Sequence, residues 1–188
     1  GLTPLRVHLD EIAAIGDKKQ LAYALGKTLR ADVDALNNTN YHTPNIFGLW
    51  VAPGFQDSEH YTAYLMQGGL QLPDSEYYLA DSEHMKNVRA KYEAHIIAML
   101  KLAGSSDAEM RAKRIVDLEH SIAESHRSLA ENEDIHKADT MWKQADFSSK
   151  APGLDWAEYF RAAGLSRVND FDVWQPDAFT NVLPLLRR

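Results

Sequence analysis

Two long segments with helical periodicity, joined by a short connection, constrain the fold of this chain more than any other feature. The first segment places apolar and aromatic residues along one helix face, namely Val88, Tyr92, His95, Ile96, Met99 and Leu100. Gly104 follows this run and predicts the C-terminal cap of the helix. Ser106 and Glu109 have the spacing of a capping box ahead of a second helix, which carries Met110, Ile115, Leu118, Ile122 and Leu129. Because the connection is short, the two segments are predicted to form an antiparallel helical hairpin.

The rest of the chain predicts shorter elements around that hairpin. Helical patterns also cover residues 4–15, 17–29 and 155–164, and another begins after Pro176. Aromatic and β-branched runs at 46–51 and 61–66 predict one antiparallel β-hairpin, and the polar residues 37–44 predict a loop. No internal repeat and no linker between two domains is evident. The predicted fold class is mainly α, with a long antiparallel helical hairpin and one small β-hairpin.

Composition excludes several classes of function. The chain has 188 residues and a formal net charge of -7, which makes nucleic acid or an anionic membrane surface a poor main partner. It contains no cysteine, so disulfides, thiolate zinc sites and thiol nucleophiles are excluded. No apolar run is long enough to predict a membrane span. The start at Gly1, with neither an initiator Met nor a signal pattern, is typical of an internal stretch of a longer protein.

No set of residues with catalytic or metal-binding spacing is present. None of the eight histidines forms the pair four residues apart that a zinc helix needs. His120 and Glu124 have helical i,i+4 spacing with His126 two residues later, and a surface pair is the better interpretation of this trio. The carboxylates Glu131, Glu133 and Asp134 near His136 lack the order of a calcium loop and predict a solvated charged loop. We therefore predict no catalytic residue and no metal ligand in this chain.

One segment has a far more specific pattern. Residues 67–79 read Gln-Gly-Gly-Leu-Gln-Leu-Pro-Asp-Ser-Glu-Tyr-Tyr-Leu and resemble the Gly-Leu-x-Leu-Pro-x-x-x-Tyr-Tyr signature of the neprilysin-like zinc metallopeptidases. Further blocks resemble the family in the same order, at residues 1–12, 47–51, 92–104, 118–123 and 152–160. The sequence departs from the family at 141–143, where Met-Trp-Lys replaces a frequent Tyr-Asn. The resemblance covers nearly the whole chain.

The resemblance implies that residues 1–188 are part of the N-terminal helical lid domain of a larger metallopeptidase. The family's His-Glu-x-x-His and Glu-x-x-x-Asp motifs, which bind zinc in the parent enzyme, are absent from this chain, so the catalytic zinc domain lies outside it. The implied partners are peptide substrates and the C-terminal catalytic domain of the same protein, and the implied location is periplasmic or extracellular. The lid would restrict access to an enclosed cavity. The alternative is a free-standing helical binding module without peptidase activity.

The resemblance also selects candidate residues in the signature segment. These are Gly68, Gly69, Leu70, Leu72, Pro73, Tyr77 and Tyr78. One hypothesis is that they shape the junction between the lid and the catalytic domain, because two glycines and a proline impose an unusual backbone path. The other is that the leucines and tyrosines only pack the core of the lid. Leu183, Leu185 and Leu186 are predicted to form apolar surface that normally faces another part of the protein.

Overall fold

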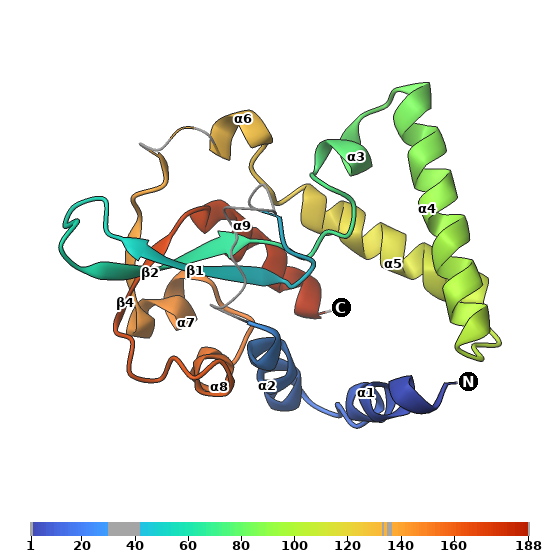
Figure 1. Ribbon diagram of the computed structural model, residues 1–188, viewed down its shortest axis with the longest axis horizontal. Helices are drawn as coiled ribbons and strands as arrows, with labels where there is room; N and C mark the ends of the chain where they lie inside the picture. The colour runs from blue at the N-terminus through green and yellow to red at the C-terminus, as the bar shows by residue number, and fades with distance from the viewer. Residues whose placement is uncertain (1, 30–41, 133, 135–136, 188) are drawn as a thin grey trace.

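The computed structural model describes residues 2–29, 42–132, 134 and 137–187. Its α-helices are α1 (Thr3–Ala13), α2 (Lys18–Thr28), α3 (Glu76–Leu79), α4 (Glu83–Leu102), α5 (Ala108–Ala123), α6 (Leu129–Asn132), α7 (Phe147–Lys150), α8 (Trp156–Ala162) and α9 (Pro176–Val182). Its strands are β1 (Phe47–Pro53), β2 (Tyr61–Gln67), β3 (Met141–Lys143) and β4 (Asp170–Val173), and its 3₁₀ helices are η2 (Gln144–Asp146) and η3 (Leu183–Arg187). The mainly α fold class is confirmed, and Figure 1 shows the sheet at one end and the helical hairpin at the other.

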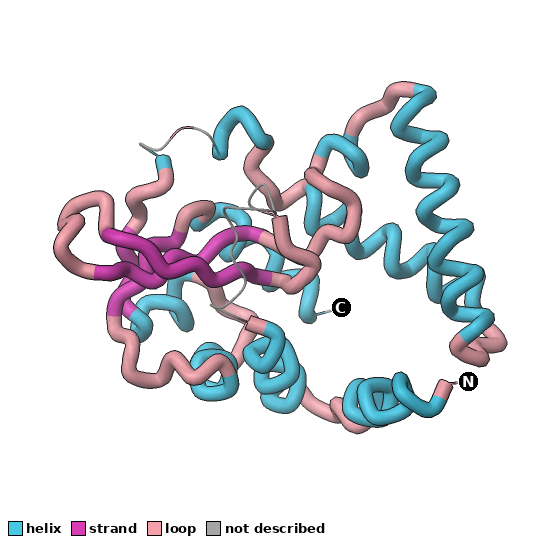
Figure 2. Tube along the Cα trace, viewed as in Figure 1, coloured by secondary structure: helices cyan, strands magenta, loops and turns pink. Residues whose placement is uncertain are grey.

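The four strands form one sheet in the order β1-β2-β4-β3 (Figure 2). The predicted hairpin is present, with β1 antiparallel to β2 and Phe47 opposite Gln67. Two strands were not predicted: β4 pairs parallel with β2, and β3 pairs antiparallel with β4. Both are too short to give an alternating pattern, since β3 has 3 residues and β4 has 4. The parallel pairing also joins segments more than a hundred residues apart, as in Ala63 opposite Phe171, which no local signal reveals.

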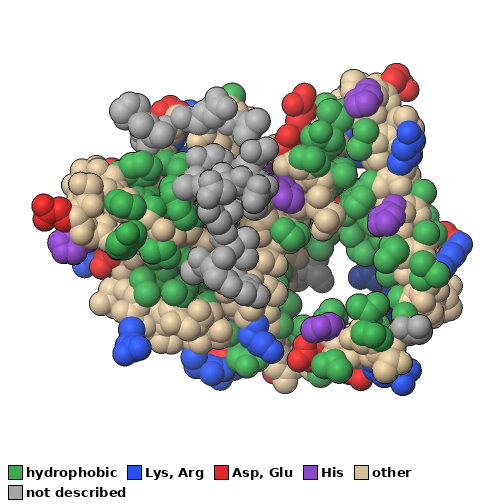
Figure 3. Space-filling view, viewed as in Figure 1, with side chains coloured by type: hydrophobic (Ala, Val, Ile, Leu, Met, Phe, Trp, Pro, Cys, Tyr) green, Lys and Arg blue, Asp and Glu red, His purple; other side chains and the backbone are tan. Residues whose placement is uncertain are grey.

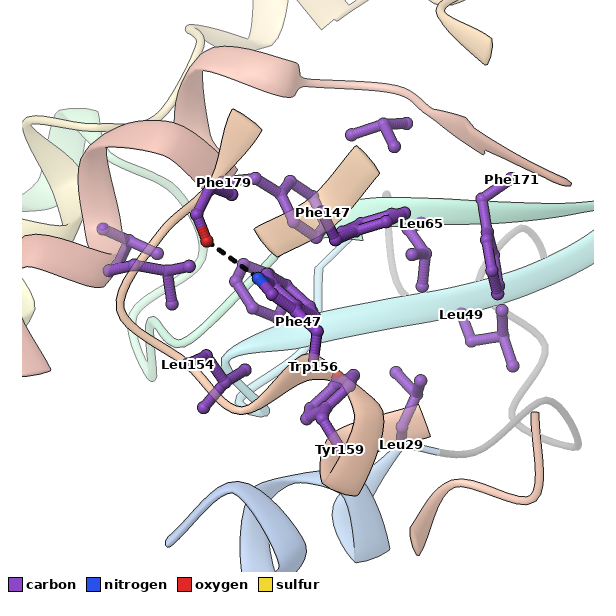
Figure 4. Packing of buried hydrophobic residues seen from close by; sticks show 14 of the residues in the cluster. Leu29, Phe47, Leu49, Leu65, Phe147, Leu154, Trp156, Tyr159, Phe171 and Phe179 are labelled. Carbon is purple, nitrogen blue, oxygen red and sulfur yellow. Dashed lines mark hydrogen bonds between the residues drawn. The ribbon is translucent and has the colours of Figure 1, made fainter. Parts of the chain in front are cut away.

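An aromatic core packs α7, α8 and α9 against β1 (Figure 4). The ring of Phe47 stacks on Phe179 with centroids 4.0 Å apart and on Trp156 at 5.7 Å. The indole Nε1 of Trp156 donates a hydrogen bond of 2.8 Å to the carbonyl oxygen of Ala151, so its polar atom is satisfied inside the core. This side of the molecule is therefore a well-packed body that can hold the sheet rigidly.

The α4–α5 hairpin forms as predicted, with differences at its ends. Gly104 has φ +86, which confirms it as the C-terminal cap of α4. The Ser106 and Glu109 capping box is wrong: Asp107 is the N-cap of α5 and pairs with Arg111 at 2.8 Å. The second helix ends at Ala123, and Leu129 belongs to the separate short helix α6. The hydroxyl of Ser128 accepts from the backbone N–H of Glu131, whose carboxylate accepts from the backbone N–H of Ser128.

Two other helices, α2 and α8, have aspartate side-chain caps at their N-termini. The Asp17 carboxylate accepts from the N–H of Gln20 at 2.7 Å, and the Asp155 carboxylate accepts from the N–H of Glu158 at 3.0 Å. The polar loop predicted at residues 37–44 falls mostly outside the described residues. Glu133 and His136 of the charged stretch also lie outside the described residues.

Apolar surface lies mainly where it was not expected. Leu183 is buried at 1% exposure, and Leu185 and Leu186 pack partly against the core, so they do not form the predicted exposed patch. Instead α1 buries no residue, and its apolar side chains, such as those of Val7 and Ile12, are exposed. Figure 3 shows an open gap between this helix and the α4–α5 hairpin. Among the described residues, none of the helices is both long and apolar enough to cross a membrane.

Candidate functional site

We define the junction segment as residues 67–79, which connects β2 to α3 and contains all seven candidate residues. Its first turn is made by two glycines, the first because a side chain has no room and the second because of its backbone conformation. A Cβ added to Gly68 would lie 2.2 Å from the carbonyl oxygen of Asn45, and Gly69 has φ +90. The Gly69 N–H donates to the carbonyl oxygen of Thr43 at 3.1 Å. The segment thus leaves the sheet in close backbone contact with residues 43–45.

Gln67, the last residue of β2, anchors the start of the junction segment. Its side chain is buried, and its amide exchanges two hydrogen bonds with the backbone of Arg127, at 3.0 Å to the carbonyl oxygen and 2.9 Å from the N–H. The backbone N–H of Gln67 donates to the side-chain oxygen of Gln175 at 2.9 Å. The amide of Gln175 donates in turn to Asn132 at 3.1 Å. A buried polar network therefore joins β2 to two distant segments.

His126 holds the glycine turn from the other side. Its Nε2 lies 3.0 Å from the carbonyl oxygen of Gly68, and because a carbonyl only accepts, Nε2 carries the proton. Burial lowers the pKa of His126 to about 4, so the imidazole is neutral near pH 7. His120 and Glu124 form an exposed pair at 3.9 Å, which confirms their interpretation as a surface pair. His126 is engaged separately, so these three residues do not form a zinc site.

Tyr78, Glu119 and Tyr92 form the polar centre of the junction. The Tyr78 hydroxyl donates to the Oε2 atom of Glu119 at 2.9 Å and accepts from the backbone N–H of Leu72 at 3.0 Å. The Tyr92 hydroxyl donates to the Oε1 atom of Glu119 at 3.0 Å. Each carboxylate oxygen thus receives a hydroxyl from a different helix, Tyr78 on α3 and Tyr92 on α4. Burial raises the pKa of both tyrosines, so both hydroxyls remain protonated donors near neutral pH.

Arg89 of α4 adds a second polar attachment of the hairpin. Its Nη1 atom donates to the carbonyl oxygen of Tyr77 at 2.9 Å and to that of Ala80 at 3.0 Å. These carbonyls belong to the short helix α3 and the residue that caps it. The guanidinium therefore fixes the C-terminal end of α3 on the side of α4.

The seven candidate residues occupy different environments. Leu70 and Tyr78 are each buried at 2% exposure, Leu72 and Tyr77 pack partly against the core, and Pro73 is exposed. The packing hypothesis for the leucines and tyrosines is thus supported by their burial. Among the described residues, no group of three His, Asp or Glu side chains could hold a metal ion. The junction segment is thus held by packing and by hydrogen bonds to the α4–α5 hairpin.

Sequence reasoning missed five residues that complete the junction: Gln67, Tyr92, Glu119, His126 and Arg127. The signal that could have found Glu119 is a carboxylate between apolar residues on the core-facing side of a predicted helix, because such a carboxylate needs hydrogen-bond donors. The suitable donors are Tyr78 in the signature segment and Tyr92 in the neighbouring helix. No comparable local signal marks Gln67, which contacts segments about 60 residues and more away.

The fold is that of a mainly α domain with one small four-stranded sheet at the end opposite the helical hairpin. The N-terminal model of Peptidase family M13 matches residues 1–188, and the chain therefore belongs to this family. It is 31% identical over 97 residues to rat endothelin-converting enzyme-like 1, a match that covers 52% of this chain and 12% of the relative. It is 24% identical over 175 residues to neprilysin-3 of Drosophila melanogaster, covering 87% of this chain and 21% of the relative.

Solved structures agree with this assignment. The zinc metalloprotease Zmp1 of Mycobacterium tuberculosis in its open state matches with a TM-score of 0.85 and 27% identity, covering 99% of this chain and 28% of that protein. The same protease in complex with an inhibitor matches with a TM-score of 0.84 and 27% identity, covering 99% of this chain and 27% of that protein. The chain therefore spans about a quarter of its structural relatives and a smaller share of the curated ones.

Proposed function

We propose that residues 1–188 are part of the non-catalytic N-terminal lid domain of a zinc metalloendopeptidase that hydrolyses peptides. The observation that carries this proposal is the TM-score of 0.85, over 99% of the chain, with a zinc metalloprotease of which the chain covers 28%. In the parent enzyme, zinc bound outside this chain would polarise the scissile carbonyl and activate water. The partners we propose are peptide substrates and the C-terminal catalytic domain of the same protein, in the periplasm or outside the cell.

The contribution of this chain is to form one wall of an enclosed substrate cavity and so to exclude large substrates. Such a wall has to be rigid, and the interlocked aromatic core and the buried network at Gln67 supply rigidity. Within the junction segment, Leu70 and Tyr78 serve packing, because they are buried. The exposed apolar residues Pro73 and Leu79 are available to contact the catalytic domain.

The test compares the chain with the intact protein that contains it. The intact protein is expected to bind one zinc ion and to cleave a fluorogenic peptide, with activity lost on chelation and restored by zinc. The chain alone is expected to bind no stoichiometric zinc and to cleave nothing. Zinc-dependent cleavage by the chain alone would overturn the lid assignment. A natural reading frame that stops just after Arg188 would instead favour the free-standing binding module.

A further inference from the structure

Helix α1 has an apolar face that is exposed to solvent. Leu5, Leu9 and Ile12 recur at helical spacing along this face, and all three side chains are exposed. None of the 11 residues of α1 is buried. A helix of this length without a buried face is marginal in water, because packing of the apolar face supplies most of the stability of a helix. The helix therefore needs a partner surface that holds it in place.

A larger relative has a helix in the corresponding position. The match with the open state of Zmp1 has a TM-score of 0.85 and covers 99% of this chain, so the 11 residues of α1 belong to the matched part. The matched part is 28% of that protein. Since the described residues of this chain bury no residue of α1, the rest of a protein of that length is the natural source of the partner surface.

A groove with apolar and basic side chains lies between the α4–α5 hairpin and η3. It is lined by Leu100, Ile115, Leu118 and Leu185 and by the two arginines Arg111 and Arg114. Arg111 pairs with Asp107 at 2.8 Å, whereas Arg114 is exposed and forms no ion pair with any residue that the structure describes. The groove thus offers apolar contacts and one unpaired guanidinium, which suit an amphipathic segment that carries a carboxylate.

The gap between α1 and the hairpin lies between these two surfaces. Figure 3 shows hydrophobic side chains on both sides of the gap, and Figure 1 shows that η3 ends beside it. In a longer polypeptide, the residues that follow η3 would therefore start next to the groove. A segment tethered there has a high effective concentration and avoids the cost of bringing two separate molecules together.

We propose that this gap is the docking site of an amphipathic segment that follows residue 188 in the same polypeptide. Its apolar side chains pack on the exposed face of α1 and fill the groove, and one of its carboxylates pairs with Arg114. Docking joins α1 to the hairpin, which the gap otherwise separates from it. The inference rests on the proposed function, because it requires that the chain is part of a longer protein.

Hydrogen exchange measured by mass spectrometry on the intact protein tests the docking site. Ile12 and Val7 are 64% and 63% exposed in residues 1–188, and Val7 lies opposite the apolar face, so they form a matched pair. In the intact protein, Ile12→Lys is expected to lower the protection of residues 3–13 by about tenfold or more, since a buried isoleucine is lost. Val7→Lys is expected to retain it. Equal protection in the two variants would overturn the proposal, and so would wild-type residues 3–13 that exchange as fast as an unfolded peptide.

Two further comparisons identify the occupant of the gap. Arg114→Glu reverses the unpaired charge and is expected to lower the same protection, whereas Lys113→Glu changes a side chain that already pairs with Asp117 at 2.8 Å and is expected to have little effect. Equal effects of these two substitutions would contradict the docking of a carboxylate. In residues 1–188 alone, residues 3–13 are expected to exchange rapidly at every protein concentration. Protection that rises with concentration would assign the gap to a second copy and overturn the proposal.

Zinc-dependent cleavage of a fluorogenic peptide, measured on the same preparations, separates the docking site from the lid assignment. An intact protein that cleaves the peptide while residues 3–13 remain unprotected would refute the docking and leave the lid assignment standing. Protected residues 3–13 in an intact protein that binds no zinc and cleaves nothing would have the opposite meaning. They would support the docking site and refute the assignment to a peptidase.

Discussion

The imidazole of His126 donates a hydrogen bond to the carbonyl oxygen of Gly68, 58 residues earlier in the chain, at 3.0 Å. The contact closes the glycine turn of the junction segment against the end of α5. Because the ring of His126 is buried, its pKa in the folded chain is about 4, below the ordinary value for histidine. The buried site favours the neutral imidazole. His126 therefore binds a proton more readily in the unfolded chain than in the folded chain.

We therefore predict that His126 makes the chain less stable in acid. The stability it confers is complete above the unfolded-state pKa near 6.5 and is lost as the pH falls through the window from 6.5 to about 4. His126→Gln keeps a donor for Gly68 and removes the titration. Between pH 7 and pH 5 the wild type is expected to lose about 2 kcal/mol more unfolding free energy than this variant, measured by urea unfolding. The exposed control His120→Gln is expected to follow the wild type, and parallel curves for all three proteins would contradict the prediction.

Gly69→Val is expected to destabilise the chain through the backbone. Gly69 has φ +90, and a Cβ there would meet the Ile46 side chain at 3.2 Å, so a valine adds both conformational strain and crowding. Gly104 is a matched control, because it has φ +86 but nothing within 4 Å of an added Cβ. Gly104→Val is expected to cost about 1–2 kcal/mol and Gly69→Val clearly more. Thermal unfolding measures both, and an unchanged melting temperature for Gly69→Val would exclude a special backbone role.

Local signals predicted the longer helices and the β-hairpin, whereas the strands that depend on pairing between distant segments were not predicted. Periodicity and the glycine cap located α4, because a helix is specified by residues within a few turns. The strand β4 could not be found in this way. Asp170 and Asp172 interrupt its apolar pattern, and its partners in β2 lie about a hundred residues earlier. Ser106 matched the capping-box pattern, yet the N-cap position of α5 is occupied by Asp107, whose carboxylate pairs with Arg111.

The junction shows the same limit. The sequence pattern of residues 67–79 identified the segment, and the glycines predicted its turn. The donors and acceptors that complete it come from α4, α5 and the segments after them. Their identity depends on which helix face meets the junction, and spacing alone does not determine that. Buried polar groups need partners, so Tyr78 in a core position already implied an acceptor, and only the fold shows that it is Glu119.

Asp172 is predicted to lower stability at neutral pH. Asp172 lies in β4 with only 1% of its surface exposed. Its carboxylate accepts a hydrogen bond of 3.1 Å from the backbone N–H of Thr140. Burial is the main reason that its pKa rises to about 6. A raised pKa means that ionisation is penalised in the folded state, so the penalty is full above pH 6 and disappears as the pH falls toward 3.8.

Asp172→Asn keeps an acceptor for Thr140 and carries no charge, so it is expected to stabilise the chain by up to about 3 kcal/mol at pH 7 and to have little effect at pH 4. Urea unfolding at the two pH values measures the difference. Asp170→Asn, at the exposed first position of the same strand, serves as the control and is expected to be neutral at both. A stabilisation of equal size at pH 4 and pH 7 would show that ionisation of Asp172 is not its cause.

Tyr78→Phe tests whether the signature tyrosine acts through its hydroxyl or only through its ring. The substitution keeps the buried ring and removes the donor to Glu119 and the acceptor for Leu72, so it is expected to cost about 1–3 kcal/mol of unfolding free energy at pH 7. Tyr77 is the matched control, since it is the adjacent residue and packs only partly against the core. Tyr77→Phe is expected to change stability by about 0.5 kcal/mol or less. Equal effects of the two substitutions in urea unfolding would mean that Tyr78 contributes packing alone, and that the hydrogen bonds at Glu119 do not hold the junction.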